Sequence, residues 1–554
     1  MNIDIVFNGR SYGADDYKNF INSQNGCQVQ AAAKVVVAMR RSPELLFAIL
    51  MLFENNCPCI PVDTSYPRER IQYIISDAAP RFIMTDSGIH ANTYLNPMNS
   101  KQNNDESDAA YILYTSGSTG NPKGVEVRRD AFDNYIEGIC EIIDFSPGKR
   151  IACLTTVSFD IFLMESVIAL YKGLTVVLGN EDEQRNPKFM GRLIADGGVD
   201  ILQMTPSRMQ LLLNHDKELN CLKNVKEILI GGEPLPLNLL RVLKERTPAR
   251  IYNMYGPTEA TIWATVSDLT EKDSIDIGRP LKNTAIYIVD ENMSVLPHGQ
   301  TGEICIGGKS LAKGYVDLDD LTVEKFIYLP DMPEERVFRT GDAGRVLPDG
   351  NIEYLYRMDN QLKIRGYRVE LEEIEVQLNQ YAGIRQSVVT VYTTGDADMV
   401  LEAFYTSEAD IPQNNLMNHL SQKLPSYMIP ALFKRVEDFI WTGNGKIDRK
   451  RVRECTVIEA GSESAGIAPT EQTTEVQRKI LQVIKSRVDQ QFSNRVVMAA
   501  SFEESGVDSL VYVELVVALE GEFDIEFDDE MIVTTAFSGF KGLVEYVESK
   551  VGER

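Results

Sequence analysis

A loop of small residues that ends in a lysine is the segment of the chain best suited to chemistry. It runs from Thr115 to Lys123, TSGSTGNPK, between two short apolar segments that we predict to be strands, Tyr111–Tyr114 and Val125–Val127. Hydroxyls and backbone N–H groups in such a loop can surround an anion, and the lysine adds positive charge. The spacing differs from that of the common nucleotide P-loop, since Gly124 and a strand follow the lysine. A flexible hairpin loop is the alternative interpretation.

Length and composition indicate a large folded protein. A chain of 554 residues is too long to form a single hydrophobic core, which predicts three or four domains, and 44% of the residues are hydrophobic. The net charge of −25 argues against nucleic acid or an anionic membrane as the partner. The N-terminal sequence MNIDIVFNGR is no signal peptide and no apolar run is long enough to span a membrane, so we expect a cytoplasmic protein. Eight scattered cysteines predict buried thiols, and four histidines share no metal-ligand spacing.

Apolar runs alternate with helical patterns after the loop, which predicts an α/β domain with a largely parallel sheet. The predicted strands are Thr175–Leu178, Ile201–Met204, Glu227–Ile230 and Ile251–Met254. Ligands usually lie at the carboxyl ends of such strands. Two polar segments fall there, at 231–234 (GGEP) and 253–259 (NMYGPTE).

The remaining segments predict smaller units. Residues 86–108 are polar and predict a loop, and so does FRTGD at 338–342. An amphipathic helix with Leu371, Ile374 and Leu378 follows, then a small α+β pattern and a linker rich in Glu, Ser, Gly and Thr. The last eighty or so residues predict a helical bundle in which Ser509 begins an apolar helix, a position that favours an attached phosphate. A plain helix cap is the alternative role for this serine.

With these residues in view, the chain resembles adenylate-forming enzymes, most closely the adenylation domains of nonribosomal peptide synthetases. The resemblance spans roughly 29–451 and rests on motifs in the family's order: YTSGSTGNPKG, FDIFLMES, NMYGPTEATIW, GEICIGG, RTGD, RMDNQLKIRGYRVE, LPSYMIP and NGKIDRK. The tail with GVDSL looks like a peptidyl carrier domain. No condensation-domain or thioesterase motif is evident, and the residues before Val29 look abbreviated.

The resemblance implies an α/β fold with three kinds of unit. These are an adenylation core with parallel sheets at 1–358, a small mobile α+β subdomain at 359–455, and, after a linker at 456–472, an all-α four-helix carrier domain at 473–554. The implied reaction joins ATP and an acid into an acyl-AMP and then passes the acyl group to a pantetheine thiol. ATP, Mg²⁺ and 4′-phosphopantetheine are the implied cofactors.

Matching the motifs residue by residue assigns the implied roles. The phosphate-binding residues would be Thr115, Ser116, Gly117, Ser118, Thr119, Gly120 and Lys123. Adenine and ribose would be bound by Gly232, Glu233, Pro234, Asn253, Tyr255, Gly256, Thr258, Asp342, Tyr354 and Arg357. Glu259 would hold Mg²⁺, and Lys446 would stabilise the charge that builds at the attacked phosphorus. Asp359 would be the hinge that exchanges Lys446 for Lys363–Gly366, and Ser509 would carry the phosphopantetheine.

Asp160 matches the aspartate that pairs with the α-ammonium of an amino acid. A fatty or aryl acid would leave this carboxylate buried and unpaired, which is costly. The other implied pocket residues are Phe159, Ile161, Met164, Gln203, Leu229, Gly231, Met254, Ile262 and Trp263. This lining resembles that of glycine-activating domains, because Trp263 would fill the space of a side chain. Alanine is the alternative substrate, and ordinary core packing is the alternative role for these residues.

Three hypotheses follow for the function. The first is a glycine-activating adenylation–carrier protein that loads its own Ser509 arm. The second is an acyl-CoA or aryl-CoA ligase, and the third is a catalytically silent carrier scaffold. The first implies a phosphopantetheinyl transferase and a downstream synthetase module or other acceptor as partners, and leaves open the need for a small activator protein.

Overall fold

The computed structural model divides the chain into two compact units. The first comprises Met1–Gln184, Lys188–Glu373 and Gln422–Pro425, and the second Arg185–Pro187, Ile374–Ser421 and Ser426–Arg554. The structure describes residues 3–24, 32–92, 108–117, 119–359, 361–364, 366–393, 399–442, 447–458, 475–487, 509–523, 525, 527–528, 531, 537 and 539–552. The domain boundaries at 358, 455 and 472 stay predictions.

A nine-stranded sheet forms one layer of the first unit, in the order β15-β14-β13-β12-β11-β9-β10-β1-β2. Its central strands run parallel, as predicted: β9 (Arg150–Cys153), β10 (Thr175–Leu178), β11 (Ile201–Met204), β12 (Glu227–Gly231) and β13 (Arg250–Tyr255). The edges are β14 (Thr265–Asp268), β15 (Arg279–Pro280), β1 (Asp4–Phe7) and β2 (Arg10–Gly13). The abbreviated N-terminal segment therefore adds strands to this sheet.

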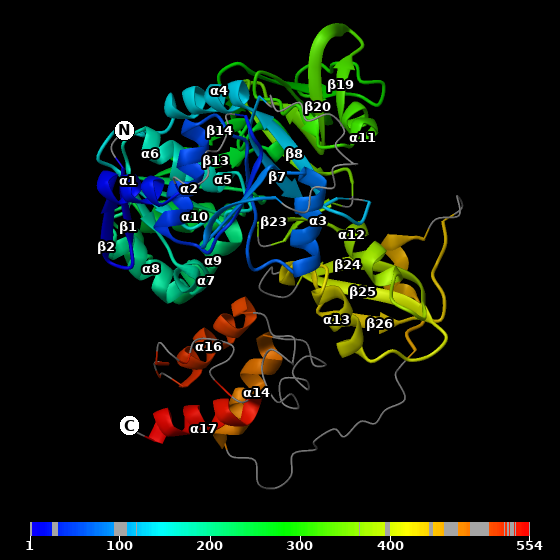
Figure 1. The fold of residues 1–554 in the computed structure, drawn as a ribbon. Coiled ribbons are helices and arrows are strands. Elements are labelled where there is room, and N and C mark those ends of the chain that lie inside the picture. The colour runs from blue at the N-terminus through cyan, green and yellow to red at the C-terminus, as the bar shows by residue number, and fades with distance from the viewer. Residues whose placement is uncertain are drawn as a thin grey trace. The chain divides into compact units, whose positions relative to one another are not determined.

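A seven-stranded sheet carries the glycine-rich loop. Its order is β18-β8-β7-β4-β3-β5-β6, with bounds Gly314–Tyr315, Lys123–Arg128, Ala109–Thr115, Cys59–Pro61, Val35–Ala38, Phe82–Thr85 and Gly88–Ala91. The predicted strands around the loop are confirmed as β7 and β8, which pair antiparallel (Figure 1). The loop predicted for 86–108 is wrong at 88–91, because β6 pairs there with β5. The prediction failed since polar residues at a sheet edge resemble a loop.

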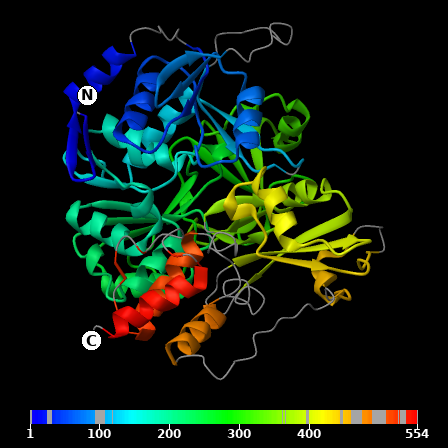
Figure 2. The same cartoon turned by 60° about the horizontal axis from the view of Figure 1, so that its bottom comes forward.

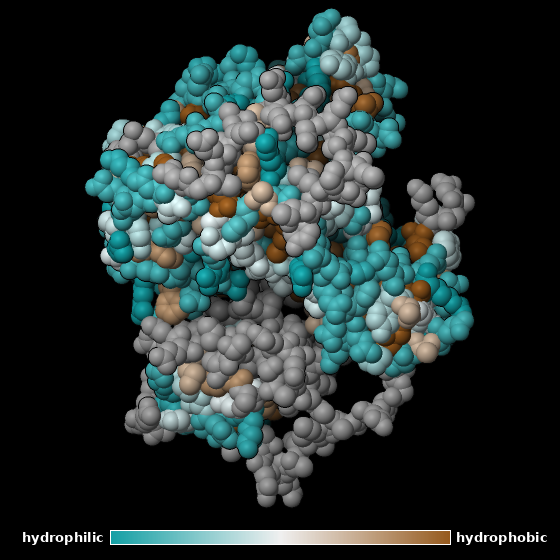
Figure 3. All heavy atoms as spheres, viewed as in Figure 1, coloured by the Kyte–Doolittle hydropathy of each residue, from teal (hydrophilic) through white to brown (hydrophobic). Residues whose placement is uncertain are grey.

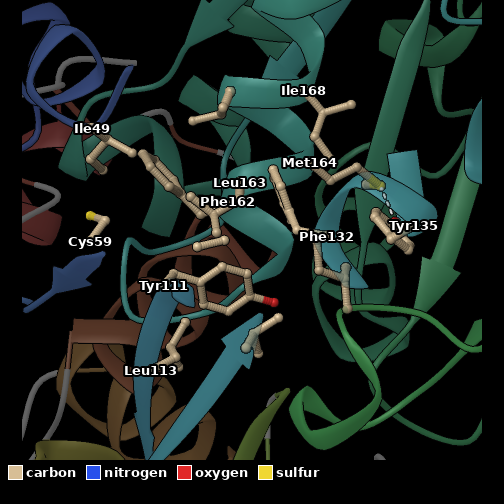
Figure 4. Packing of buried hydrophobic residues seen from close by; sticks show 14 of the residues in the cluster. Ile49, Cys59, Tyr111, Leu113, Phe132, Tyr135, Phe162, Leu163, Met164 and Ile168 are labelled. Atoms are coloured by element: carbon tan, nitrogen blue, oxygen red, sulfur yellow. Dashed lines mark hydrogen bonds between the residues drawn. The ribbon is translucent and has the colours of Figure 1, made fainter. Parts of the chain in front are cut away.

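One apolar cluster contains residues of both sheets and of the helices packed on them. It includes nearly all of α2 (Pro43–Glu54), whose first turn is capped by Ser42 accepting a hydrogen bond from the N–H of Leu45. Figure 4 shows part of this cluster, in which Tyr111 on β7 lies near Phe132 and Phe162. The other helices of this part are α1 (Ala14–Ser23), α3 (Arg68–Ala78), α4 (Arg129–Cys140), α5 (Ile161–Leu163), α6 (Ala169–Tyr171), α7 (Glu181–Arg185), α8 (Pro187–Asp196), α9 (Pro206–His215) and α10 (Leu237–Arg246).

A mainly antiparallel five-stranded sheet follows. It contains β16 (Thr284–Val289), β17 (Gly302–Gly308), β19 (Phe326–Leu329), β20 (Met332–Val346) and β21 (Ile352–Arg357), with helix α11 (Asp319–Lys325) beside it. FRTGD lies inside β20, so the predicted loop is wrong. Pairing with β17 and β21 holds these residues extended despite their turn-like sequence. The hairpin β22 (Gln361–Ile364) and β23 (Tyr367–Glu370) comes next.

The second unit contains a three-stranded sheet and helices. Its strands are β24 (Ile384–Thr393), β25 (Met399–Ser407) and β26 (Leu432–Arg435), and its helices include most of α12 (Leu371–Asn379), then α13 (Gln413–Ser421), α14 (Glu475–Arg487), α16 (Ser509–Phe523) and α17 (Gly539–Gly552). The amphipathic helix is confirmed as α12, whose Leu371, Ile374 and Leu378 are buried. Helix α14 contacts both α16 and α17, the orange and red helices of Figures 1 and 2.

Hydrophilic residues cover much of the face shown in Figure 3, as the charged composition predicts. Among the described helices, none has the length and apolarity needed to cross a bilayer. The described part of the chain also holds no group of three or more His, Cys, Asp or Glu arranged to bind a metal. The prediction of buried thiols holds for five of the seven described cysteines, Cys57, Cys59, Cys153, Cys305 and Cys455, whereas Cys140 and Cys221 are only partly buried.

Candidate adenylation site

The glycine-rich loop closes a tight hairpin between β7 and β8. Thr115 pairs with Lys123 at its base. A Cβ at Gly117 would lie 2.2 Å from the carbonyl oxygen of Asn121, and Gly120 has a φ of +89°. Both positions therefore require glycine. Ser118 lies outside the described residues.

The loop already binds an anion, and that anion is a carboxylate of the protein. The N–H of Gly117 donates to Glu373 Oε2 at 2.9 Å, and the hydroxyl of Ser116 donates to the carbonyl of Arg368 at 2.8 Å. Glu373 is fully buried and also accepts from Arg70 Nη1 at 2.7 Å. The hydroxyl of Thr115 is buried without a partner in the described structure. These donors fit the phosphate oxygens that the sequence predicts for this loop.

Lys123 supplies the positive charge beside the loop. Its side chain is buried, with Nζ 3.9 Å from Glu370 Oε1 and 5.0 Å from the centre of the Tyr315 ring. Burial and the nearby Arg368 lower the pKa of Lys123 to about 8, although Glu259 and Glu370 oppose the shift. A buried ammonium beside this loop is suited to bind an anionic ligand.

Glu259, the predicted Mg²⁺ ligand, lies fully buried against a cationic group. Arg368 Nη1 donates to both of its carboxylate oxygens, at 3.0 and 2.8 Å, and the hydroxyl of Tyr315 donates to Oε1 at 2.8 Å. Burial alone would raise the pKa of Glu259, but Arg368 and Lys123 lower it to about 2. This ionised carboxylate suits a hard cation, and in the structure the Arg368 guanidinium is its cationic partner.

The predicted ribose-binding residues form one connected group. Asp342 is buried and accepts from the hydroxyl of Tyr255 at 2.6 Å and from Arg357 Nη1 at 2.9 Å. Arg357 also donates to Asp359, with Nε 2.9 Å from Oδ1. The ring of Tyr354 lies 6.4 Å from that of Tyr255. The structure thus brings the predicted hinge residue Asp359 into the same group as Asp342.

The predicted adenine-side residues lie at the ends of β12 and β13. Gly232 has a φ of +86°, which suits glycine, and starts the turn that carries Glu233. Glu233 Oε2 accepts from the N–H and the hydroxyl of Ser207 at 3.0 and 2.6 Å. The side-chain nitrogen of Asn253 donates to the carbonyl of Asp276 at 2.8 Å. The adenine contacts of these residues stay predictions.

The hairpin β22–β23 lies against this site. A Cβ at Gly366 would come within 2.6 Å of Thr205 Cγ2, and the Tyr367 ring stacks edge-on to Phe159 with centres 5.2 Å apart. Burial lowers the pKa of Lys363, which lies near Asp342 and Glu233. Lys363, Gly366 and Arg368 are therefore close to the core residues that the motifs assign to ATP.

Asp160 lies buried, and none of the described groups that act on its carboxylate is a cation. Its Oδ2 accepts from the N–H of Ile262 at 3.3 Å. Burial raises the pKa of Asp160 to about 6, and hydrogen bonds from Thr258 and Ile262 oppose the rise. Thr261 and Ile262 both have positive φ, +60° and +65°, so a strained turn directs this N–H. A buried carboxylate in this state is suited to bind an ammonium.

The other predicted pocket residues gather on one face of the nine-stranded sheet. Leu229 on β12, Met254 on β13, and Met164, Ile262 and Trp263 belong to one buried cluster. In Figure 4 the sulfur of Met164 lies at the hydroxyl of Tyr135, a contact of 3.3 Å. A Cβ at Gly231 would lie 2.8 Å from Trp263 Cη2, so this glycine makes room for the indole. The protein's own side chains therefore fill this region.

The side chains of the predicted catalytic residue Lys446 and of the predicted attachment residue Ser509 are not placed. Lys446 lies outside the described residues, and so does the side chain of Ser509, although α16 begins at Ser509 as predicted. Sequence reasoning missed Arg70, Tyr315, Arg368 and Glu373. Arg368 and Glu373 lie within or next to the motif RGYRVE, but their partners are distant in the chain, which no spacing reveals.

The chain matches the models of two protein families. The model of a family described as "AMP-binding enzyme" matches residues 23–316, more than half of the chain, and that of "phosphopantetheine attachment site" matches 494–547. These two matches correspond to an adenylation domain fused to a carrier domain. ATP with Mg²⁺ and 4′-phosphopantetheine are the cofactors of such a pair, as predicted.

Tyrocidine synthase 2 from Brevibacillus parabrevis is 33% identical over 542 residues, which are 95% of this chain. The chain spans only 10–15% of the length of such curated synthases. A solved synthetase protein with adenylation and carrier domains has a TM-score of 0.72 at 23% identity, covering 94% of this chain and 89% of its own. A four-domain nonribosomal peptide synthetase bound to AMP and glycine has a TM-score of 0.56 at 28% identity, covering 98% of this chain and 41% of its own.

Proposed function

The chain belongs to the AMP-binding enzyme family, and from this premise we propose that it activates glycine with ATP and loads it onto its own phosphopantetheine arm. In the first step a carboxylate oxygen of glycine attacks the α-phosphorus of ATP. A new P–O bond forms, the bond to the β-phosphate breaks, and pyrophosphate leaves with glycyl-AMP remaining. The phosphopantetheine arm on Ser509 would supply the thiol for the second step, in which a thioester would form at the glycyl carbon while its bond to AMP breaks and AMP leaves.

The residues around the glycine-rich loop supply the charge for the first step. The Gly117 N–H, the Thr115 hydroxyl and the Lys123 ammonium would bind the β- and γ-phosphates. Glu259 would hold Mg²⁺, which supplies positive charge to the phosphate oxygens when bound. Asp342 and Arg357 would hold the ribose, and Lys446 would bridge the acid and the α-phosphate.

The single observation that carries the choice of an amino acid is the buried Asp160 with no described cation beside it. An α-ammonium would relieve this unpaired charge. Glycine is the proposed amino acid because Trp263 packs against Gly231 where a larger side chain would go. The related four-domain synthetase was solved with AMP and glycine, which supports the same choice. Alanine is the second candidate.

The segment 363–373 and MgATP would use the same groups. In the structure Arg368 binds Glu259 and Glu373 binds the loop N–H, so a metal and a phosphate would have to displace them. We therefore place this arrangement after pyrophosphate release, when the site is open to the arm. Movement about Asp359 would remove the segment and bring Lys446 to the site for the first step.

The other two hypotheses have features against them. An acyl-CoA ligase would need no fused carrier domain and would leave Asp160 unpaired. A silent scaffold would need neither the buried Lys123 nor the ionised Glu259. A phosphopantetheinyl transferase and a downstream acceptor enzyme are the partners that the proposal requires, and a cytoplasmic location stays a prediction.

The test is mass spectrometry of the whole protein. The chain is first treated with coenzyme A and a phosphopantetheinyl transferase, then with ATP, Mg²⁺ and glycine. The proposal predicts two successive mass increases, one for the arm and one for a glycyl group that hydroxylamine removes. An arm that stays unloaded with glycine and with alanine would overturn the substrate proposal.

A further inference from the structure

Gln203 is a polar residue in an apolar face of the nine-stranded sheet. Side chains alternate along β11, and Ile201 belongs to the cluster that contains Leu229, Met254 and Trp263, whereas Leu202 and Met204 belong to the cluster on the other face. Gln203 lies two residues after Ile201, so it shares the face of the proposed glycine pocket. Only 2% of its surface is exposed.

The two ends of the Gln203 amide have different surroundings. In the structure Gln203 Oε1 lies 3.3 Å from the hydroxyl oxygen of Thr155. Gln203 Nε2 is buried and has no partner in the described structure. A buried N–H without a partner is rarer and more costly than a buried carbonyl oxygen without one. This difference bears on which end is the nitrogen.

The hydroxyl of Thr155 has a single proton, and it donates this proton in a hydrogen bond to Glu165. The hydroxyl donates to Glu165 Oε1 at 2.7 Å, while Oε2 accepts from the N–H groups of Leu154 and Thr155, both at 2.9 Å. Burial raises the pKa of Glu165, but these hydrogen bonds and the charges of Arg41 and Arg208 oppose the rise. Both oxygens of Glu165 accept hydrogen bonds, as those of a carboxylate do, so the Thr155 oxygen has only lone pairs left for Gln203.

The group of Gln203 that faces Thr155 must then be its nitrogen, since only a donor can use those lone pairs. A half-turn of the terminal amide exchanges its nitrogen and oxygen without moving other atoms. The oxygen then lies at the end that lacks a partner. An ammonium ligand carries three N–H donors, and Asp160 already accepts from the N–H of Ile262.

We propose that Thr155, held by Glu165, is a positioning residue that turns the carbonyl oxygen of Gln203 toward the amino acid, where it accepts a hydrogen bond from the α-ammonium. The inference rests on the proposed function, because it requires an amino acid in this pocket. Asp160 supplies the counter-charge, and Gln203 fixes the direction of a second N–H. The π-helical turn Met164–Ile168 places Glu165 next to the pocket residue Met164.

The experiment uses the full chain and two non-hydrolysable adenylates, the glycyl and the acetyl sulfamoyl adenosines, which differ only in the ammonium. Calorimetry gives their dissociation constants for the wild type and for Thr155→Val, Thr155→Ser, Gln203→Met and the Thr155→Val/Gln203→Met double variant. Thermal unfolding followed by circular dichroism checks that each variant is folded.

We expect Thr155→Val to weaken the glycyl analogue about tenfold, or about 1.4 kcal/mol, and to leave the acetyl analogue within about twofold. Thr155→Ser keeps the hydroxyl and should bind both analogues like the wild type. The double variant should lose no more than Gln203→Met, since Thr155 acts through Gln203. Equal losses for both analogues, or losses that multiply in the double variant, would overturn the inference. A wild type that binds larger aminoacyl analogues more tightly than the glycyl one would instead overturn the choice of glycine.

Discussion

Asp160 combines a functional charge with a cost in stability. Its pKa of about 6 exceeds the ordinary value of 3.8, so the folded protein binds more protons than the unfolded chain between these values. The stability of the ligand-free protein therefore falls as the pH rises through this range. Above about pH 6 the ionised carboxylate costs up to about 3 kcal/mol, at about 1.4 kcal/mol for each pKa unit.

We predict that Asp160→Asn raises the melting temperature of the ligand-free protein at pH 7 and removes glycine-dependent ATP–pyrophosphate exchange. The amide keeps an acceptor for the Ile262 N–H but carries no charge to bury or to pair. Calorimetric melting at pH 7 and pH 4.5 checks this, and the difference between wild type and variant should shrink at pH 4.5. A variant that is less stable than the wild type at pH 7 contradicts this account of Asp160.

The lowered pKa of Lys123 predicts that the KM for ATP depends on pH. Its pKa of about 8 means that the ammonium loses its proton as the pH rises above 8, whereas an ordinary lysine stays charged to about 10.5. The KM for ATP should therefore rise about fivefold between pH 8 and pH 9, since binding phosphate then requires a proton. Lys123→Arg stays charged and should show a flat profile over this range. A wild-type KM that is constant to pH 9.5 would argue against a phosphate role for Lys123.

At the scale of elements, the β22–β23 hairpin places one cation and one anion where the proposed function needs a metal and a phosphate. Arg368 contacts Glu259, and Glu373, which follows the hairpin, contacts the Gly117 N–H. If Glu259 holds Mg²⁺ as we propose, Arg368 and the metal compete for one carboxylate.

We predict that Arg368→Ala lowers the Mg²⁺ concentration needed for half-maximal ATP–pyrophosphate exchange by about tenfold. The variant leaves Glu259 without its competing guanidinium, and a buried carboxylate that has lost its ion pair gains by binding a cation. Arg368→Lys, which keeps the charge, is the matched control and should stay near the wild type. An unchanged Mg²⁺ requirement in Arg368→Ala would show that the two do not compete.

The elements were more predictable than their contacts. Short apolar runs such as Thr175–Leu178 match the observed strands because local sequence alone identifies a buried parallel strand. FRTGD failed for the opposite reason: its glycine and aspartate favour a turn, and only pairing with distant strands holds it extended. Glu259 was predicted from its motif, but its pairing with Arg368, 109 residues away, has no local signal. The relay from Glu165 through Thr155 to Gln203 is likewise a product of tertiary structure.

At the scale of the whole molecule, an adenylation domain and a carrier domain are joined in one chain. The carrier helices include α16, which begins at Ser509, so an attached phosphate would lie at the positive end of a helix. A carrier in the same chain raises the local concentration of the acceptor thiol. Loading should therefore be insensitive to the overall protein concentration.

We predict that Ser509→Ala prevents addition of the phosphopantetheine arm and all loading of glycine, while pyrophosphate exchange continues. Ser505→Ala, four residues earlier, is the matched control and should accept both arm and glycine. Intact-mass spectrometry distinguishes the two variants. An arm found on Ser509→Ala would place the attachment elsewhere.

We propose that Asp160 and the filled pocket select glycine as the acid that ATP activates. The most direct measurement is ATP–pyrophosphate exchange by the full chain with each proteinogenic amino acid in turn. We predict a dominant signal with glycine, a weaker one with alanine, and none above background with larger amino acids. A dominant signal with a larger amino acid would contradict the account of the pocket, and exchange with none of them would contradict the proposed activity itself.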